Sequence, residues 1–147
     1  MRYTSLFFIV VIIFFSCDNP LRSDEIELEL NQEFELTVGE EGTFPRENLT
    51  VGFSHVIEDS RCPKDWRCFV AGNGKVAVWF RKSNNDAISH ELNTNYGSSE
   101  TTYLSYLVRL IELKPYPVGD ETIPPSDYSI ILRVNKVCNS SDKNFIL

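Results

Sequence analysis

Polar and apolar residues alternate along much of the chain after residue 25. The alternation is clearest at 25–30 (EIELEL), 33–38 (EFELTV) and 49–57 (LTVGFSHVI). Successive side chains of a β-strand point to opposite faces, so this period of two predicts strands with one buried face. The same reasoning predicts further strands at 75–81, 87–92 and 127–137.

The segment 103–113 (YLSYLVRLIEL) fits either a strand or a helix. As a strand it puts Leu107 and Leu113 on one face and Val108 and Leu110 on the other, and the prolines after Lys114 suit a strand end. Turn-forming and polar residues predict loops at 39–42, 58–73, 83–86 and 93–102. About seven short strands without a convincing amphipathic helix predict an all-β fold, either an antiparallel β-sandwich or a small barrel.

The first sixteen residues follow a different pattern. Arg2 is followed by ten unbroken apolar residues from Leu6 to Phe15, and the small residue Ser16 then precedes Cys17. Ten residues are too few for a helix that spans a bilayer, which needs about twenty. A positive start, a short apolar run and a small residue are typical of an export signal.

The tetrapeptide Phe14-Phe15-Ser16-Cys17 resembles the lipobox of bacterial lipoproteins, with Phe14 where leucine is usual. The resemblance implies cleavage before Cys17, diacylglycerol on its thiol and a place in the cell envelope, at the outer rather than the inner membrane. An uncleaved anchor or an ordinary secretory signal is the alternative. The expected organisation is signal peptide 1–16, tether 17–25, β-sandwich domain 26–138 and C-terminal tail 139–147.

Charge narrows the range of partners. The formal net charge is −7, so both phosphate backbones and anionic lipid surfaces repel the chain. We therefore expect no nucleic-acid partner, and we expect membrane association only through lipid on Cys17.

The chain has four cysteines. An exported protein meets an oxidising environment, so we expect some of them to form disulfides. If Cys17 carries lipid, Cys62 and Cys68, six residues apart around Pro63, are expected to form a local disulfide, and Cys138 is left over. Pairing of Cys138 with either of them is the alternative. The spacing does not fit a tetrahedral zinc site, and no cofactor motif is present, so neither a metal nor a cofactor is expected.

The run 56–63 (VIEDSRCP), then Cys68 and 71–74 (AGNG), precedes the predicted strand at 75–81, and a PYP segment follows at 115–117. This arrangement resembles a group of small exported proteins, often lipoproteins, with an EDSRCP…C…AGNG segment between two strands. The resemblance covers roughly residues 33–136. It implies a fold and a location but no activity.

The best candidate for an interaction site is Trp66, which lies between Lys64 and Arg67 on the expected disulfide loop. An aromatic side chain flanked by cations on a constrained loop is typical of an interface anchor. The alternative is that Trp66 folds back over the sheet and covers the core.

Two other groups of residues favour a structural role. Asp59 is expected to cap a turn and Arg61 to bond to Glu58 or Asp59, with a cation or ligand site as the alternative. His55 and His90 lack any accompanying nucleophile motif, so no enzymatic activity is expected.

The sequence therefore favours a non-catalytic binding module for an envelope protein or a saccharide. The alternatives are an assembly accessory without its own ligand, an enzyme of unrecognised type, and a protease inhibitor that presents Lys64.

Overall fold

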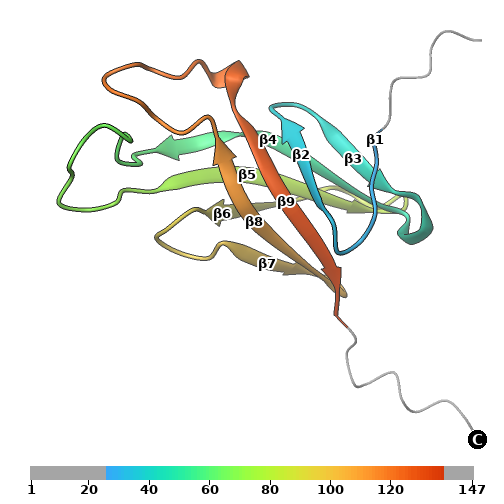
Figure 1. Cartoon of the computed structure of the whole chain (residues 1–147). Coiled ribbons are helices and arrows are strands. Elements are labelled where there is room, and N and C mark those ends of the chain that lie inside the picture. The colour runs from blue at the N-terminus through green and yellow to red at the C-terminus, as the bar shows by residue number, and fades with distance from the viewer. Residues whose placement is uncertain (1–25, 138–147) are drawn as a thin grey trace, which may run out of the picture.

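The computed structural model describes residues 26–137 and consists of two open β-sheets that pack face to face (Figure 1). One sheet has the order β1-β3-β4-β5-β6 and the other β2-β9-β8-β7. Every pairing is antiparallel except that of β1 with β3. The all-β sandwich is therefore confirmed, with nine strands rather than seven. The strands are β1 (Ile26–Glu27), β2 (Glu33–Thr37), β3 (Glu41–Phe44), β4 (Leu49–Asp59), β5 (Gly74–Lys82), β6 (Ile88–Asn93), β7 (Glu100–Tyr103), β8 (Tyr106–Lys114) and β9 (Ser129–Lys136).

The core lies between the sheets and is built from the alternating apolar positions that the sequence shows. Alternate residues of β4 up to Phe53 and of β5 up to Phe80 are buried against the matching face of β8 and β9. Burial of these side chains removes apolar surface from water, which is the main driving force for folding. The fully buried residues of these strands include Leu49, Val51, Phe53, Val76, Val78, Phe80, Val108, Ile130, Leu132 and Val134.

Two irregularities change which residues face the core. A register shift between Phe53 and His55 leaves His55 exposed, although the alternation aligned it with Phe53. A second shift between Leu110 and Glu112 brings Leu113 into the core, on the same side as Leu110. An extra residue in one strand turns all later side chains over, so a simple period of two is wrong beyond each bulge.

Two strands lie where the sequence predicts loops. Strand β3 begins inside the glycine-rich 39–42 segment, and a Cβ on Gly42 would lie 2.5 Å from Leu28 Cδ1. Strand β7 lies in the polar 93–102 stretch and continues to Tyr103. Conversely, the strand expected at 25–30 forms only the two-residue β1. The ambiguous segment 103–113 contains the end of β7 and most of β8, so the strand interpretation is confirmed.

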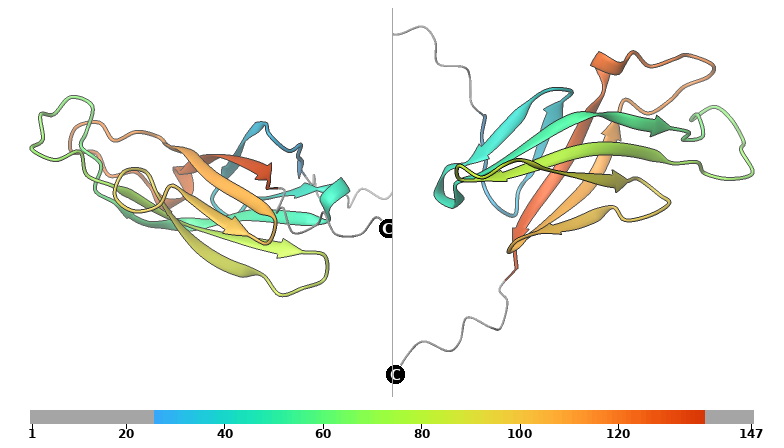
Figure 2. Two further views of the ribbon diagram at one scale, coloured as in Figure 1. Left: turned by 90° about the horizontal axis from the view of Figure 1, so that it is seen from below. Right: turned by 180° about the vertical axis from the view of Figure 1, so that it is seen from behind.

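The β4–β5 loop (residues 60–73) and the β8–β9 loop (residues 115–128) extend side by side from one end of the sandwich, opposite β1 (Figures 1 and 2). We call these two loops together the loop tip. Cys17, the expected signal peptide and tether, Cys138 and the expected tail lie outside the described residues. Among residues 26–137 no helix has the length and apolar character needed to cross a membrane.

Candidate functional site

A disulfide joins Cys62 to Cys68, with an S–S distance of 2.09 Å and Cα atoms 6.0 Å apart. The expected local pairing is therefore confirmed. The bond closes a short ring that contains all three candidate binding residues, Lys64, Trp66 and Arg67. Cross-linking a loop of this length restricts the unfolded chain and limits the conformations of the folded loop.

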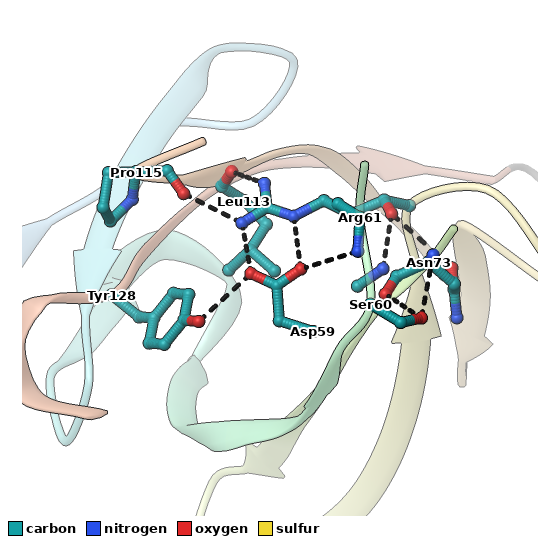
Figure 3. Close-up of polar contacts among 9 residues, drawn as sticks. Asp59, Ser60, Arg61, Asn73, Leu113, Pro115 and Tyr128 are labelled. Carbon is teal, nitrogen blue, oxygen red and sulfur yellow. Dashed lines mark hydrogen bonds and ion pairs between the residues drawn. The ribbon is translucent and has the colours of Figure 1, made fainter. Parts of the chain in front are cut away.

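Asp59 and Arg61 form a buried clamp at the base of the β4–β5 loop (Figure 3); their side chains are 7% and 4% exposed. Arg61 Nε donates to Asp59 Oδ1 at 2.7 Å, and Arg61 Nη2 donates to Asp59 Oδ2 at 2.6 Å. The guanidinium also donates to the carbonyls of Leu113 (2.5 Å) and Pro115 (2.8 Å). The clamp thus fastens the β4–β5 loop to the start of the β8–β9 loop, which confirms the structural interpretation of this pair.

Tyr128 completes the clamp from the far end of the β8–β9 loop. Its hydroxyl donates to Asp59 Oδ2 at 3.1 Å (Figure 3). Burial, followed by the negative charge of Asp59, raises the pKa of Tyr128 to about 12. The hydroxyl is therefore neutral and able to donate throughout the physiological pH range. Glu58 is exposed, so the two adjacent carboxylates do not converge into one site.

Asn73, the asparagine of the AGNG segment, braces the base of the β4–β5 loop through both its backbone and its side chain. Its backbone pairs with Ser60, because Ser60 N donates to Asn73 O at 2.7 Å and Asn73 N donates to Ser60 Oγ at 3.2 Å. Its buried side-chain oxygen accepts from the amides of Asn95 (3.0 Å) and Tyr96 (3.2 Å). Its Nδ2 donates to Asn93 Oδ1 at 2.8 Å. This network connects the base of the β4–β5 loop to the loop that follows β6.

Direct contacts join the two loops of the tip. The amide of Lys64 donates to Pro117 O at 3.0 Å, and the amide of Gly119 donates to Asp65 Oδ1 at 2.7 Å. Lys64 Nζ lies 5.4 Å from the centre of the Tyr116 ring, a cation–π distance. The two loops therefore form a single braced unit.

Apolar side chains project from this unit into solvent. Phe69 is fully exposed, Trp66 is 51% exposed, and Val70 and Val118 are both more than half exposed. Trp66 does not cover the core, so that alternative is wrong. Single exposed apolar residues are ordinary on protein surfaces, but several of them on one braced pair of loops are typical of an interaction site.

Sequence reasoning identified Trp66 but missed Phe69 and Val70. These two residues directly follow Cys68 in a segment that is otherwise rich in turn-forming residues. Phe69 and Val70 lie outside every alternating stretch, so neither is expected on the buried face of a strand. Their position in a predicted loop was therefore the sign that they are exposed.

The histidines, the cleft and the possible metal ligands do not form a second candidate site among the described residues. The His90 ring packs against Phe80, with ring centres 5.3 Å apart, and its Nδ1 lies 3.0 Å from Thr101 Oγ1. A cleft of about 820 Å³ lies beside β1 and β2, lined by residues from Glu27 to Phe34 and from Phe44 to Glu47, and neither histidine lines it. Within the described part of the chain, no three His, Cys, Asp or Glu residues are grouped to hold a metal ion.

Comparisons with protein-family models, with curated proteins and with solved structures found no match. The resemblance to exported proteins with the EDSRCP segment therefore stays a prediction. The loop tip, with its braces and its exposed apolar side chains, is the strongest candidate for a functional site.

Proposed function

We propose that the protein is a lipid-anchored, non-catalytic binding module of the cell envelope whose loop tip docks a protein partner. The observation that carries this proposal is the full exposure of Phe69 on the same braced loop as the exposed Trp66 and Val70. Burying such side chains against a partner removes apolar surface from water. Because the loop is held in advance, little conformational entropy is lost when it binds.

A protein fits this surface better than a saccharide does. Sugars are recognised by polar side chains that match their hydroxyl groups and by aromatic rings that stack on the face of the sugar, and at the loop tip Trp66 is the most exposed such ring after Phe69. Val70 and Val118 offer neither hydrogen bonds nor a ring face, and they lie on the same loop tip as Phe69. Fully buried interface centres are enriched in aromatic residues and depleted of charge, which matches the chemistry of this group.

The anchoring part of the proposal rests on the residues before the described domain. We propose that residues 1–16 are removed, that Cys17 carries diacylglycerol in the outer membrane, and that residues 17–25 form the tether. The loop tip lies at the end of the sandwich opposite β1, which suits a surface presented away from the anchor (Figure 1). Mass spectrometry of the mature N-terminus is expected to find lipid on Cys17, and an unmodified Cys17 or a retained Met1 contradicts the anchor.

The contacts of Lys64 do not support the protease-inhibitor alternative. Its amide is bonded to Pro117 O and its ammonium group lies over Tyr116, so the residue is held against the neighbouring loop. An inhibitory loop instead presents its specificity residue freely to the protease pocket. The exposed apolar group also distinguishes the proposed module from an accessory protein without its own ligand.

Capture from envelope extracts tests the binding function with a matched pair of variants. The full-length lipoprotein carrying Phe69→Ser is expected to lose most of the partner retained by the parent protein. Ile88→Ser is the control, because Ile88 is 51% exposed but begins β6, beside Phe80 near the far end of β5. Both changes lie on the surface and are expected to alter stability by less than about 0.5 kcal/mol. Equal capture by the Phe69→Ser variant and the parent protein contradicts the proposed function.

A further inference from the structure

The β8–β9 loop of the tip carries negative charge only. Asp120, Glu121 and Asp127 all lie exposed on it, and residues 115–128 contain no lysine or arginine. Asp127 accepts a hydrogen bond from Ser126 Oγ at 3.0 Å. The carboxylates of Asp120 and Glu121 form no ion pair and no hydrogen bond with any described residue. This loop therefore presents carboxylates that the described fold does not neutralise.

A third carboxylate reaches the same place from the β4–β5 loop. The turn that carries Asp120 and Glu121 is closed by the amide of Glu121, which donates to Val118 O at 3.4 Å. Within this turn the amide of Gly119 donates to Oδ1 of the exposed Asp65 at 2.7 Å. Asp65, Asp120 and Glu121 are therefore gathered at one turn, and we call these three residues the acidic rim.

The cations of the tip do not balance this charge. Lys64 and Arg67 lie exposed on the β4–β5 loop. Lys64 Nζ lies over the Tyr116 ring, and Arg67 forms no ion pair with a described residue. Arg61 is already neutralised by Asp59 in the buried clamp. Two exposed cations thus stand against four exposed anions, and the loop tip is negative.

Exposed apolar side chains adjoin the acidic rim in the sequence of both loops. Val118 directly precedes Gly119, and Trp66 directly follows Asp65; each is 51% exposed. A partner that covers these apolar groups also takes water from the neighbouring carboxylates, which is unfavourable unless the partner supplies cations or donors in its place. The sign of the charge beside the apolar group therefore selects the sign of charge on the partner.

We propose that the protein partner of the loop tip is basic, with apolar side chains that meet Phe69, Val70 and Val118 and with lysine or arginine side chains that meet the acidic rim. This inference rests on the proposed function, because it takes the loop tip as the docking surface and specifies the chemistry of its occupant. Complementary charge speeds the encounter of two proteins and disfavours partners of the wrong sign.

Selection from a random library of short peptides displayed on phage tests the charge of the partner. The full-length chain in mild detergent is the target, and phage that also bind the Phe69→Ser variant are removed, so that only peptides that depend on the loop tip remain. These peptides are expected to combine apolar residues with an excess of lysine and arginine over aspartate and glutamate. An excess of acidic residues, or a charge no different from that of the unselected library, overturns the inference.

Charge variants then locate a selected basic peptide on the acidic rim. Asp120→Asn combined with Glu121→Gln is expected to weaken its binding about tenfold, because the attraction of two carboxylates is lost. The matched control is Glu29→Gln combined with Asp86→Asn. It removes the same charge from exposed residues that lie after β1 and between β5 and β6, away from the loop tip, and is expected to change binding less than about twofold.

The possible outcomes separate the inference from the proposed function. Equal weakening by the two pairs of substitutions means that the peptide responds only to net charge, and the inference is then overturned. If the selected peptides depend on Phe69 but are not basic, the loop tip still docks a protein and only the charge of the partner is wrong. If no peptide depends on Phe69, the proposed function fails as well.

Discussion

Replacing Arg61 with methionine is expected to lower the free energy of unfolding by about 3–5 kcal/mol, because it leaves a buried carboxylate without its cation. The side chain of Asp59 is 7% exposed and accepts two hydrogen bonds from the guanidinium. Methionine fills similar space but donates nothing, so the carbonyls of Leu113 and Pro115 also lose a donor. Urea denaturation followed by tryptophan fluorescence measures the change.

The control for the clamp removes both charges. Arg61→Met combined with Asp59→Leu is expected to be more stable than Arg61→Met alone, because no unpaired charge stays buried. Tyr128→Phe, which removes one hydrogen bond to the carboxylate, is expected to cost only about 1 kcal/mol. Two results contradict this account of the clamp: a fall of less than about 1 kcal/mol in the free energy of unfolding of Arg61→Met, or a double variant that is less stable than Arg61→Met.

Gly72→Ala is expected to be the second most damaging single change, with a loss of about 3 kcal/mol or more. Gly72 has φ +69°, in the left-handed region where a side chain costs about 1–2 kcal/mol. A Cβ there would also lie 1.7 Å from Ser60 O, so the backbone beside Asn73 has to separate. The change therefore disturbs the same brace that positions the loop tip, and thermal unfolding measures it.

Gly39→Ala separates the two causes. Gly39 has φ +86°, but its Cβ would meet nothing within 4 Å. This variant is expected to show only the backbone cost of about 1–2 kcal/mol. If Gly72→Ala and Gly39→Ala lose the same stability, the clash with Ser60 O adds nothing to the cost of Gly72→Ala, which contradicts this prediction.

The sequence predicted the strands whose buried positions form a run of alternating apolar residues and missed two short strands that lack such a run. Alternation located β2, β4, β5 and β9 because their inward residues must be apolar to form the core. Strand β3 buries only Gly42 and Phe44, and strand β7 buries only Tyr103, so neither shows a run of alternating apolar residues. The bulges in β4 and β8 depend on how neighbouring strands align, which a single strand does not reveal.

The candidate site was predictable only where its contacts are local. The Asp59–Arg61 pair and the Cys62–Cys68 bond join residues close in sequence, and both were expected. The bonds from Arg61 to Leu113 and Pro115 cross more than fifty residues and require the sheet topology. Phe69 was missed because an apolar residue is assigned to the core by default, whereas a binding surface leaves it in solvent.

The central claim is that the loop tip is the docking surface of this protein. Site-specific photo-crosslinking in intact cells tests it most directly, with the photoreactive residue placed at position 69 or, as control, at position 88 of the full-length chain. The account predicts a discrete protein adduct from position 69 and none from position 88. Adducts from position 88 alone, or no adduct from position 69, contradict it.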